Sequence, residues 1–176
     1  MEKNSNKKGV SRRAFLGTTA AAAAGITMVP SHVVAGLGHK APSDKLNIAG
    51  IGIGGMGFAN LKNLEEENIV GLCDVDWKYS KRVFDYFPNA KKYKDWRKMY
   101  DEMAKDIDAV VVATADHTHA ITAAHAITMG KHVYVQKPLT HSVYESRLLT
   151  KLADKYKVAT QMGNQGSSGE GVNLTT

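Results

Sequence analysis

Short apolar runs alternate with amphipathic segments along the chain from residue 45 onward. The clearest run, residues 107–113, is rich in β-branched side chains, which is typical of a parallel strand covered on both faces. Farther along, Leu149, Leu152, Ala153 and Tyr156 recur at the spacing of one helix face. The pattern predicts strands at residues 46–51, 69–73, 91–94, 107–113, 132–135 and 158–161. It predicts helices at residues 56–66, 77–86, 96–103 and 118–129 and around 149–156.

This order of elements indicates the fold class. Strands that alternate with helices imply right-handed crossovers and a parallel sheet. Six such strands match the doubly wound arrangement with strand order 3-2-1-4-5-6. We therefore predict an α/β Rossmann domain over residues 45–166.

The first 35 residues have a different character. Residues 11–17 read S-R-R-A-F-L-G, which resembles a twin-arginine export signal, and a soft apolar stretch follows at residues 18–29. That stretch is short and weak for a transmembrane helix, which needs about 20 strongly apolar residues. We interpret residues 1–35 as a twin-arginine signal peptide and residues 36–44 as a linker, and expect export to the periplasm with no stable membrane anchor. An uncleaved anchor or a chance arginine pair is the alternative.

Charge and cysteine content narrow the function further. The formal net charge is +6, but the leader carries most of it, and no basic stripe with interleaved aromatic residues remains in the rest of the chain. Binding to nucleic acid is therefore not expected. The single cysteine, Cys73, allows no internal disulfide and is interpreted as a small buried apolar residue. No cysteine and histidine cluster has zinc-site spacing, so we predict no metal.

A glycine-rich turn supplies the main functional motif. Residues 52–57 read G-x-G-x-x-G, after a predicted strand and at the start of a predicted helix, and Asp74 lies 22 positions beyond Gly52. Gly52 would permit a tight turn, Gly54 would let a pyrophosphate approach the backbone, and Gly57 would let helix and strand pack closely. This context is the one that a dinucleotide-binding site requires.

We predict that this turn holds the pyrophosphate at the start of the helix, where free N–H groups favour an anion. The predicted contacts are Gly52, Ile53, Gly54, Gly55, Met56 and Gly57. Asp74 would accept hydrogen bonds from the adenosine ribose and repel a 2′-phosphate, so NAD is favoured over NADP, although Lys78 or Arg82 could weaken that preference. A glycine-rich turn in an α/β domain that binds no nucleotide is the alternative.

Three loops should meet at the carboxyl ends of the later strands, where ligands bind in such sheets. They are residues 114–119 (T-A-D-H-T-H), 136–139 (Q-K-P-L) and 162–166 (M-G-N-Q-G). Nearby, Asp95 and Trp96 could contact the adenine or could equally cap a helix.

These motifs together resemble the N-terminal domain of the Gfo/Idh/MocA oxidoreductases, which include glucose–fructose oxidoreductase and inositol dehydrogenase. The resemblance covers residues 45–166. The family's loops usually read T-P-x-x-x-H and E-K-P. In this chain Ala115 replaces the proline and Gln136 replaces the glutamate. The second exchange removes a negative charge beside Lys137.

The resemblance implies roles for the loop residues. Lys137 would contact the nicotinamide ribose and act on the reacting substrate oxygen as the catalytic residue, unless it is simply an exposed turn lysine. Gln136 and Pro138 would lie beside it at the cofactor, and the proline often follows a cis peptide bond in this family. Thr114, His117 and His119 would line the nicotinamide side. His119 could instead cap or pack at the start of a helix.

The resemblance also implies an incomplete enzyme. Family members carry a C-terminal α/β substrate domain, and residues 167–176 would begin the connection to it. That domain would supply most substrate contacts and could carry a homo-oligomer interface. The expected reaction is hydride transfer between NAD and a secondary alcohol of a small sugar or polyol. A glycosidase of the same family that uses NAD transiently, and a non-catalytic dinucleotide-binding protein, are the alternatives.

Overall fold

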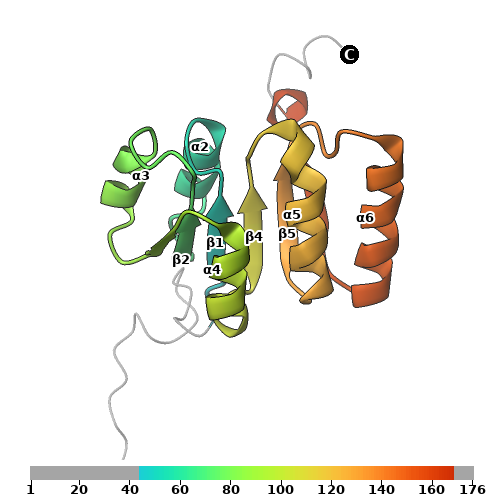
Figure 1. The fold of residues 1–176 in the computed structure, drawn as a ribbon, viewed down its shortest axis with the longest axis horizontal. Coiled ribbons are helices and arrows are strands. Elements are labelled where there is room, and N and C mark those ends of the chain that lie inside the picture. The colour runs from blue at the N-terminus through green and yellow to red at the C-terminus, as the bar shows by residue number, and fades with distance from the viewer. Residues whose placement is uncertain (1–43, 169–176) are drawn as a thin grey trace, which may run out of the picture. The chain divides into compact units, whose positions relative to one another are not determined.

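The computed structural model describes residues 44–168, which form a six-stranded parallel sheet in the order β3-β2-β1-β4-β5-β6 (Figure 1). The strands are β1 (Asn47–Ile51), β2 (Asn68–Cys73), β3 (Lys91–Tyr93), β4 (Ala109–Val112), β5 (His132–Gln136) and β6 (Thr160–Gly163). The helices are α2 (Met56–Lys62), α3 (Lys81–Tyr86), α4 (Trp96–Met103), α5 (Asp116–Thr128) and α6 (Val143–Tyr156), with 3-10 turns η3 (Ala104–Asp106) and η4 (Gln165–Ser168). The predicted doubly wound order is confirmed.

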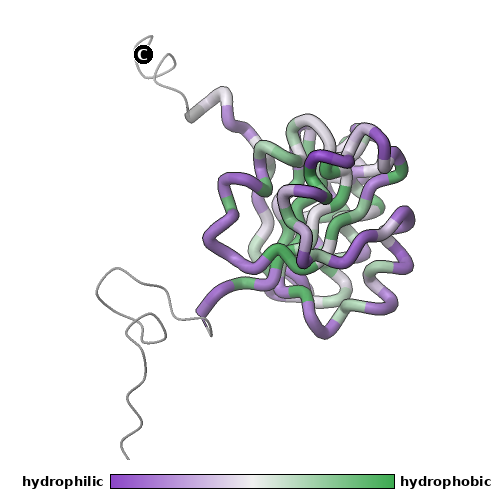
Figure 2. The backbone as a smooth tube through the Cα atoms, turned by 90° about the vertical axis from the view of Figure 1, so that its left-hand side faces the viewer, coloured by the Kyte–Doolittle hydropathy of each residue, from purple (hydrophilic) through white to green (hydrophobic). Residues whose placement is uncertain are grey.

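Helices cover both faces of the sheet, and the alternation of side chains along β4 shows how. Val110 and Val112 lie in one buried cluster with residues of α4, α5 and α6, whereas Val111 lies in a second cluster with residues of α2 and α3. Successive strand residues point to opposite faces, so a continuous apolar run fills two cores. Figure 2 shows the same arrangement, with hydrophobic residues gathered in the interior and hydrophilic residues on the outer turns.

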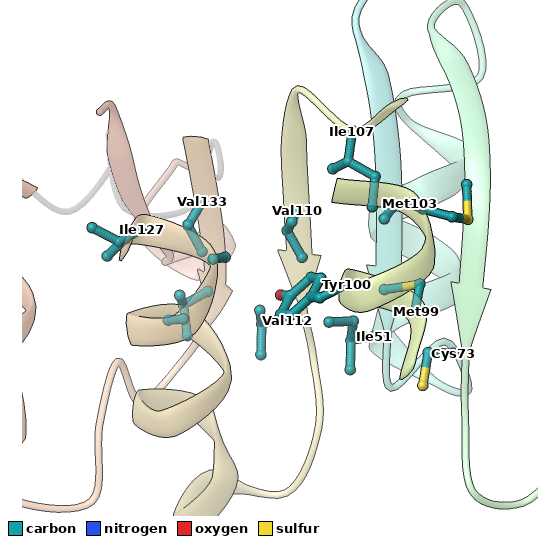
Figure 3. Packing of buried hydrophobic residues seen from close by; sticks show 14 of the residues in the cluster. Ile51, Cys73, Met99, Tyr100, Met103, Ile107, Val110, Val112, Ile127 and Val133 are labelled. Atoms are coloured by element: carbon teal, nitrogen blue, oxygen red, sulfur yellow. The ribbon is translucent and has the colours of Figure 1, made fainter. Parts of the chain in front are cut away.

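A buried tyrosine anchors α4 in the first cluster. Tyr100 is 1% exposed, and Figure 3 shows its ring beside Val112 and Ile51 of the neighbouring strands. Its hydroxyl donates to the Thr122 carbonyl of α5 at 3.5 Å. Burial raises the pKa of Tyr100, because the phenolate would lose its hydration. This side chain therefore joins α4 to the sheet and to α5 as a neutral phenol.

Several predicted boundaries differ from the observed ones, and at three elements a local turn explains the difference. Helix α2 ends at Lys62, where the chain tightens into a turn in which Leu64 N donates to Leu61 O at 3.0 Å. Helix α3 begins at Lys81 rather than at residue 77, because Asp76 organises a turn before it. Strand β6 begins at Thr160 rather than at residue 158, because Lys157 takes a left-handed conformation with φ 56° that ends α6.

Part of one sheet face is hollowed beside α2. The hollow has a volume of about 460 Å³ and is lined mainly by apolar side chains, among them Ile48, Leu64 and Val111. It lies over β1, β4, β5 and β6, away from the glycine-rich turn.

No helix within residues 44–168 is long and apolar enough to cross a membrane. The predicted signal peptide lies outside the described residues, as do most of the linker and the chain beyond Ser168.

Candidate functional site

The glycine-rich turn lies where the strand order reverses, between β1 and β4. Gly52 follows β1 with φ +73°, and a Cβ added there would lie 2.6 Å from the carbonyl oxygen of Ala113, just beyond β4. A Cβ on Gly57, the second residue of α2, would overlap with the carbonyl oxygen of Gly52. At both positions the backbone of another segment comes so close that only glycine fits, as the sequence predicts. This turn lies at the switch point of the sheet, where ligands bind in such folds.

The space in front of Gly54 is used differently from the prediction. A Cβ on Gly54 would overlap with the ring of Tyr79, a side chain that is 64% exposed. The sequence analysis assigned that space to an approaching pyrophosphate. In this structure the aromatic ring fills it, so any group that reaches Gly54 from that side meets Tyr79 first.

Asp74 lies one strand away from the glycine turn and faces it. Its Oδ2 accepts hydrogen bonds from the Ser80 hydroxyl at 2.7 Å and from Gly54 N at 3.2 Å. Its Oδ1 accepts one from Asp76 N at 3.0 Å. Three donors thus hold one carboxylate, and one of them comes from the glycine turn itself. Asp74 and the glycine turn, which we expect to form one site, are therefore in direct contact.

A cleft of about 390 Å³ opens between these elements, within the size range of small-molecule sites. It brings together five of the predicted site residues, namely Gly52, Gly54, Gly55, Asp74 and Thr114. Val75, Tyr79, Lys94, Trp96 and Thr118 are further lining residues. The cleft therefore has a peptide floor, one carboxylate and an aromatic side.

From the sequence, Asp95 and Trp96 could either contact the adenine or cap a helix. In the structure the two residues differ in this respect. Asp95 is the N-cap of α4, and its side chain accepts a hydrogen bond from Arg97 N at 2.9 Å. Trp96 lines the cleft, with the Arg97 guanidinium 4.9 Å from its ring centroid. Lys94, which also lines the cleft, lies 5.4 Å from the Trp77 ring centroid.

The remaining predicted site residues are not lining residues of this cleft. They are Ile53, Met56, Gly57, His117, His119, Gln136, Lys137 and Pro138. Ile53 is buried in the second core cluster, while His117 is exposed in the first turn of α5 and Lys137 is exposed directly after β5. The Lys137–Pro138 peptide bond is cis, as expected from the resemblance.

His119 is buried beneath two of the loops. It is 1% exposed, with Nδ1 2.6 Å from the Pro138 carbonyl oxygen and Nε2 3.0 Å from the Thr114 carbonyl oxygen. The ring therefore ties the loop after β4 to the turn after β5. One of the two roles open for His119 from the sequence was packing at the start of a helix. Its burial and its two contacts with carbonyl oxygens correspond to that role.

Gln136 belongs to an uncharged network that the sequence analysis missed. Its Oε1 accepts from Gln165 Nε2 at 3.1 Å, and Gln165 Nε2 also contacts Asn60 Oδ1 at 2.9 Å and the Tyr134 hydroxyl at 2.9 Å. Gln136 is 7% exposed, whereas its neighbour Lys137 is exposed. The side chain of Gln136 therefore lies in the buried network, and that of Lys137 lies at the surface. No motif in the sequence links residues 60, 136 and 165.

Cys73 is not a candidate nucleophile. It is 2% exposed, and burial, together with the negative charges of Asp74 and Asp95, raises its pKa to about 12. A thiol in such surroundings stays protonated. Within residues 44–168, no group of three histidine, cysteine, aspartate or glutamate residues is placed to hold a metal ion.

Comparison with known families agrees with this geometry. Residues 46–164 match the Gfo/Idh/MocA oxidoreductase family, which is described by its NAD-binding Rossmann fold. The chain belongs to this family. The predictions of the family, of a Rossmann fold and of NAD as the cofactor class are thereby confirmed.

Individual Gfo/Idh/MocA relatives carry different names. The chain is 32% identical over 119 residues to glycosyl hydrolase family 109 protein 2 of Akkermansia muciniphila, covering 61% of this chain and 25% of that protein. It is 29% identical over 94 residues to inositol 2-dehydrogenase of Salmonella typhimurium, covering 51% of this chain and 27% of that enzyme.

Solved Gfo/Idh/MocA structures share the fold. GenD2 from gentamicin A biosynthesis, in complex with NAD, superposes with a TM-score of 0.63 and 27% identity, covering 78% of this chain and 37% of that one. The chain therefore spans only about a quarter of the length of the two curated relatives and about a third of this solved structure.

Proposed function

We propose that this chain is the cofactor-binding part of an NAD-dependent oxidoreductase that transfers hydride to or from a secondary alcohol of a sugar or polyol. The observation that carries the proposal is the Asp74 carboxylate, which lines the same cleft as Gly52 and Gly54 and accepts a hydrogen bond from Gly54 N. A carboxylate at the end of the second strand, beside a glycine turn, is the arrangement that binds an adenosine ribose and its pyrophosphate. The name of the inositol dehydrogenase relative supports the substrate class.

The described residues fit a dinucleotide. Because Gly54 N already donates to Asp74, the backbone of Gly55, with that of Met56 just outside the cleft, would hold the pyrophosphate. Asp74 would hold the adenosine ribose, and Trp96 would lie at the adenine side of the cleft. Thr114 would lie toward the nicotinamide. Bound NAD supplies a hydride acceptor for the substrate carbon.

Lys137 is the proposed catalytic residue. It is exposed beside the cis Pro138 turn, and the ring of His119 links this turn to the loop that carries Thr114. An ammonium group near the substrate oxygen would stabilise negative charge there and help move the hydroxyl proton. Residue 136 is neutral here, and its side chain lies in the network with Gln165, so it places no negative charge next to this ammonium group.

Two further expectations complete the proposal. A second domain beyond the described residues would supply most substrate contacts, in keeping with the greater length of the relatives. The twin-arginine motif at residues 11–17 would direct the protein, folded and with its cofactor, to the periplasm.

A glycosidase is the second candidate, because the Akkermansia relative is named a glycosyl hydrolase. In that case bound NAD would take a hydride from the sugar, the glycosidic bond would break by elimination, water would add to the resulting double bond, and the hydride would return to the sugar. Cleavage of an aryl glycoside by the full-length protein, with no net NADH formed, would favour this candidate. Steady NADH formation from a free polyol would favour the dehydrogenase.

Titration of the purified chain with NADH tests the cofactor assignment directly. One of its two tryptophans, Trp96, lines the cleft, so energy transfer from tryptophan to bound NADH should report binding. Asp74→Ala should weaken NADH binding about tenfold or more, because hydrogen bonds to a charged group are lost. Asp101→Ala, which removes a carboxylate from the exposed surface of α4, is the matched control and should change nothing. Equal affinity for the Asp74 variant and the control would reject the assignment.

A further inference from the structure

Ser80 is a buried serine whose hydroxyl faces the candidate cofactor site. It is 0% exposed, and its Oγ donates to Asp74 Oδ2 at 2.7 Å. Neither the glycine motif nor the loops at the strand ends include this residue. It reaches the site through the fold, by this contact across the turn between β2 and α3 and by its closeness to Gly54, where an added Cβ would lie 3.4 Å from Ser80 Oγ.

The position of Ser80 in the chain makes this contact notable. Ser80 is the N-cap residue of α3, where a serine hydroxyl normally accepts a hydrogen bond from a backbone N–H of the first helical turn. Here the side chain makes no such capping bond. The hydroxyl donates to Asp74 instead, so the start of α3 forgoes its side-chain cap in favour of the cleft carboxylate.

Ser80 is also the donor to Asp74 that a mutation can remove. The other two donors to Asp74, Gly54 N and Asp76 N, are backbone groups. Together the three donors hold both carboxylate oxygens, which fixes the plane of the group. The turn that carries Ser80 is itself held by Asp76, whose Oδ1 accepts from Tyr79 N at 2.9 Å and whose carbonyl accepts from Ser80 N at 3.0 Å.

We infer that Ser80 is a positioning residue that orients Asp74 toward the adenosine ribose and thereby sets the preference for NAD over NADP; this inference rests on the proposed function. The three donors occupy both acceptor sites of Oδ2 and one of Oδ1, so a carboxylate held in this orientation keeps its remaining acceptor site, on Oδ1, for a ribose hydroxyl. The same fixed negative charge repels a 2′-phosphate, because it cannot turn away. Lys94 is the one basic residue among the cleft-lining residues described, so a freed carboxylate would leave this cation to attract the phosphate.

The test compares NADH and NADPH binding by the whole chain and its variants. Ser80→Ala should weaken NADH binding about three- to tenfold, the loss of one charge-assisted hydrogen bond, while NADPH binding stays the same or improves. Thr122→Val is the matched control. Thr122 is also 0% exposed, but its hydroxyl has no hydrogen-bond partner among the described residues and lies in α5. A merely structural effect would weaken both dinucleotides together and leave their ratio unchanged.

A double-mutant cycle shows whether Ser80 acts through Asp74. Ser80→Ala introduced into the Asp74→Ala protein should produce no further loss of NADH binding. An equal loss in both backgrounds, or an unchanged ratio of NADH to NADPH affinity, would overturn the inference while the proposed function stands. Failure of the wild-type chain to bind NADH would overturn both.

Discussion

Two adjacent residues at the end of β2 have opposite environments. Asp74 lines the cleft and accepts three hydrogen bonds, whereas Cys73 is 2% exposed in the core cluster seen in Figure 3. Asp74 comes directly after the last residue of β2, so one step along the chain takes the side chain from the buried strand to the edge of the sheet where the cleft opens. The charge on Asp74 also acts on its neighbour, because it helps to raise the pKa of Cys73.

The shifted thiol gives a prediction about pH. The pKa of Cys73 rises from 9.0 to about 12 in the fold, so between these values the unfolded chain loses its thiol proton before the folded chain does. Cys73 therefore contributes stability that is complete below pH 9 and is lost as the pH rises toward 12. Urea unfolding of the wild type and of Cys73→Ala across this range should give free energies of unfolding whose difference shrinks as the pH rises. A difference that stays constant would contradict the prediction.

At the scale of elements, the start of α2 is pressed against the end of β1. Gly57 lets the helix approach the Gly52 carbonyl, and Gly52 in turn approaches Ala113 beyond β4. These are backbone contacts, which cannot relax by a side-chain rotation. Gly54, by contrast, faces the exposed ring of Tyr79, which can swing aside. Within this motif, Gly52 and Gly57 are therefore required by backbone packing, whereas Gly54 lines the cleft and faces a side chain that can move.

Alanine substitutions should separate these two kinds of glycine. We expect Gly57→Ala to lower the free energy of unfolding by about 3 kcal/mol or more, because its Cβ overlaps with a backbone oxygen. Gly54→Ala should lower it by less than about 1 kcal/mol, because only the Tyr79 side chain has to move. Denaturant unfolding of the two variants measures both values. Equal losses would show that the Tyr79 ring cannot move as readily as its exposure indicates.

For the whole molecule, the strand order brings the carboxyl ends of β1, β2 and β4 to one cleft, although 61 positions along the chain separate Ile51, the last residue of β1, from Val112, the last residue of β4. The same order leaves an apolar hollow of about 460 Å³ beside α2, at a distance from the cleft. The curated relatives are about four times longer than the part they share with this chain. The candidate cleft is therefore lined by residues of a segment that is a fraction of its relatives' length.

Export is the prediction that belongs to the whole protein. If residues 11–17 are a twin-arginine signal, then Arg12→Lys combined with Arg13→Lys should keep the protein in the cytoplasm as an uncleaved precursor. Cell fractionation followed by mass measurement of the N-terminus would show this. Lys7→Ala combined with Lys8→Ala removes two charges from the same leader and should leave export intact. Cytoplasmic retention of both double variants, or of neither, would argue against the signal.

The sequence by itself determined the fold class, the strand order and the pairing of the glycine turn with Asp74. These features follow from hydrophobic periodicity and from short motifs, which are local in the chain and repeat in every Rossmann sheet. The alternation of Val110, Val111 and Val112 between two cores was likewise implicit in an uninterrupted apolar run.

Only the tertiary structure decided what individual side chains contact. Ser80 bonds to Asp74 instead of capping its own helix, and the Tyr79 ring fills the space before Gly54. Gln136 joins a network with residues 60 and 165, and His119 lies between two carbonyl oxygens from different loops. Such contacts depend on how distant segments pack against one another, and residue spacing along the chain carries no record of that packing.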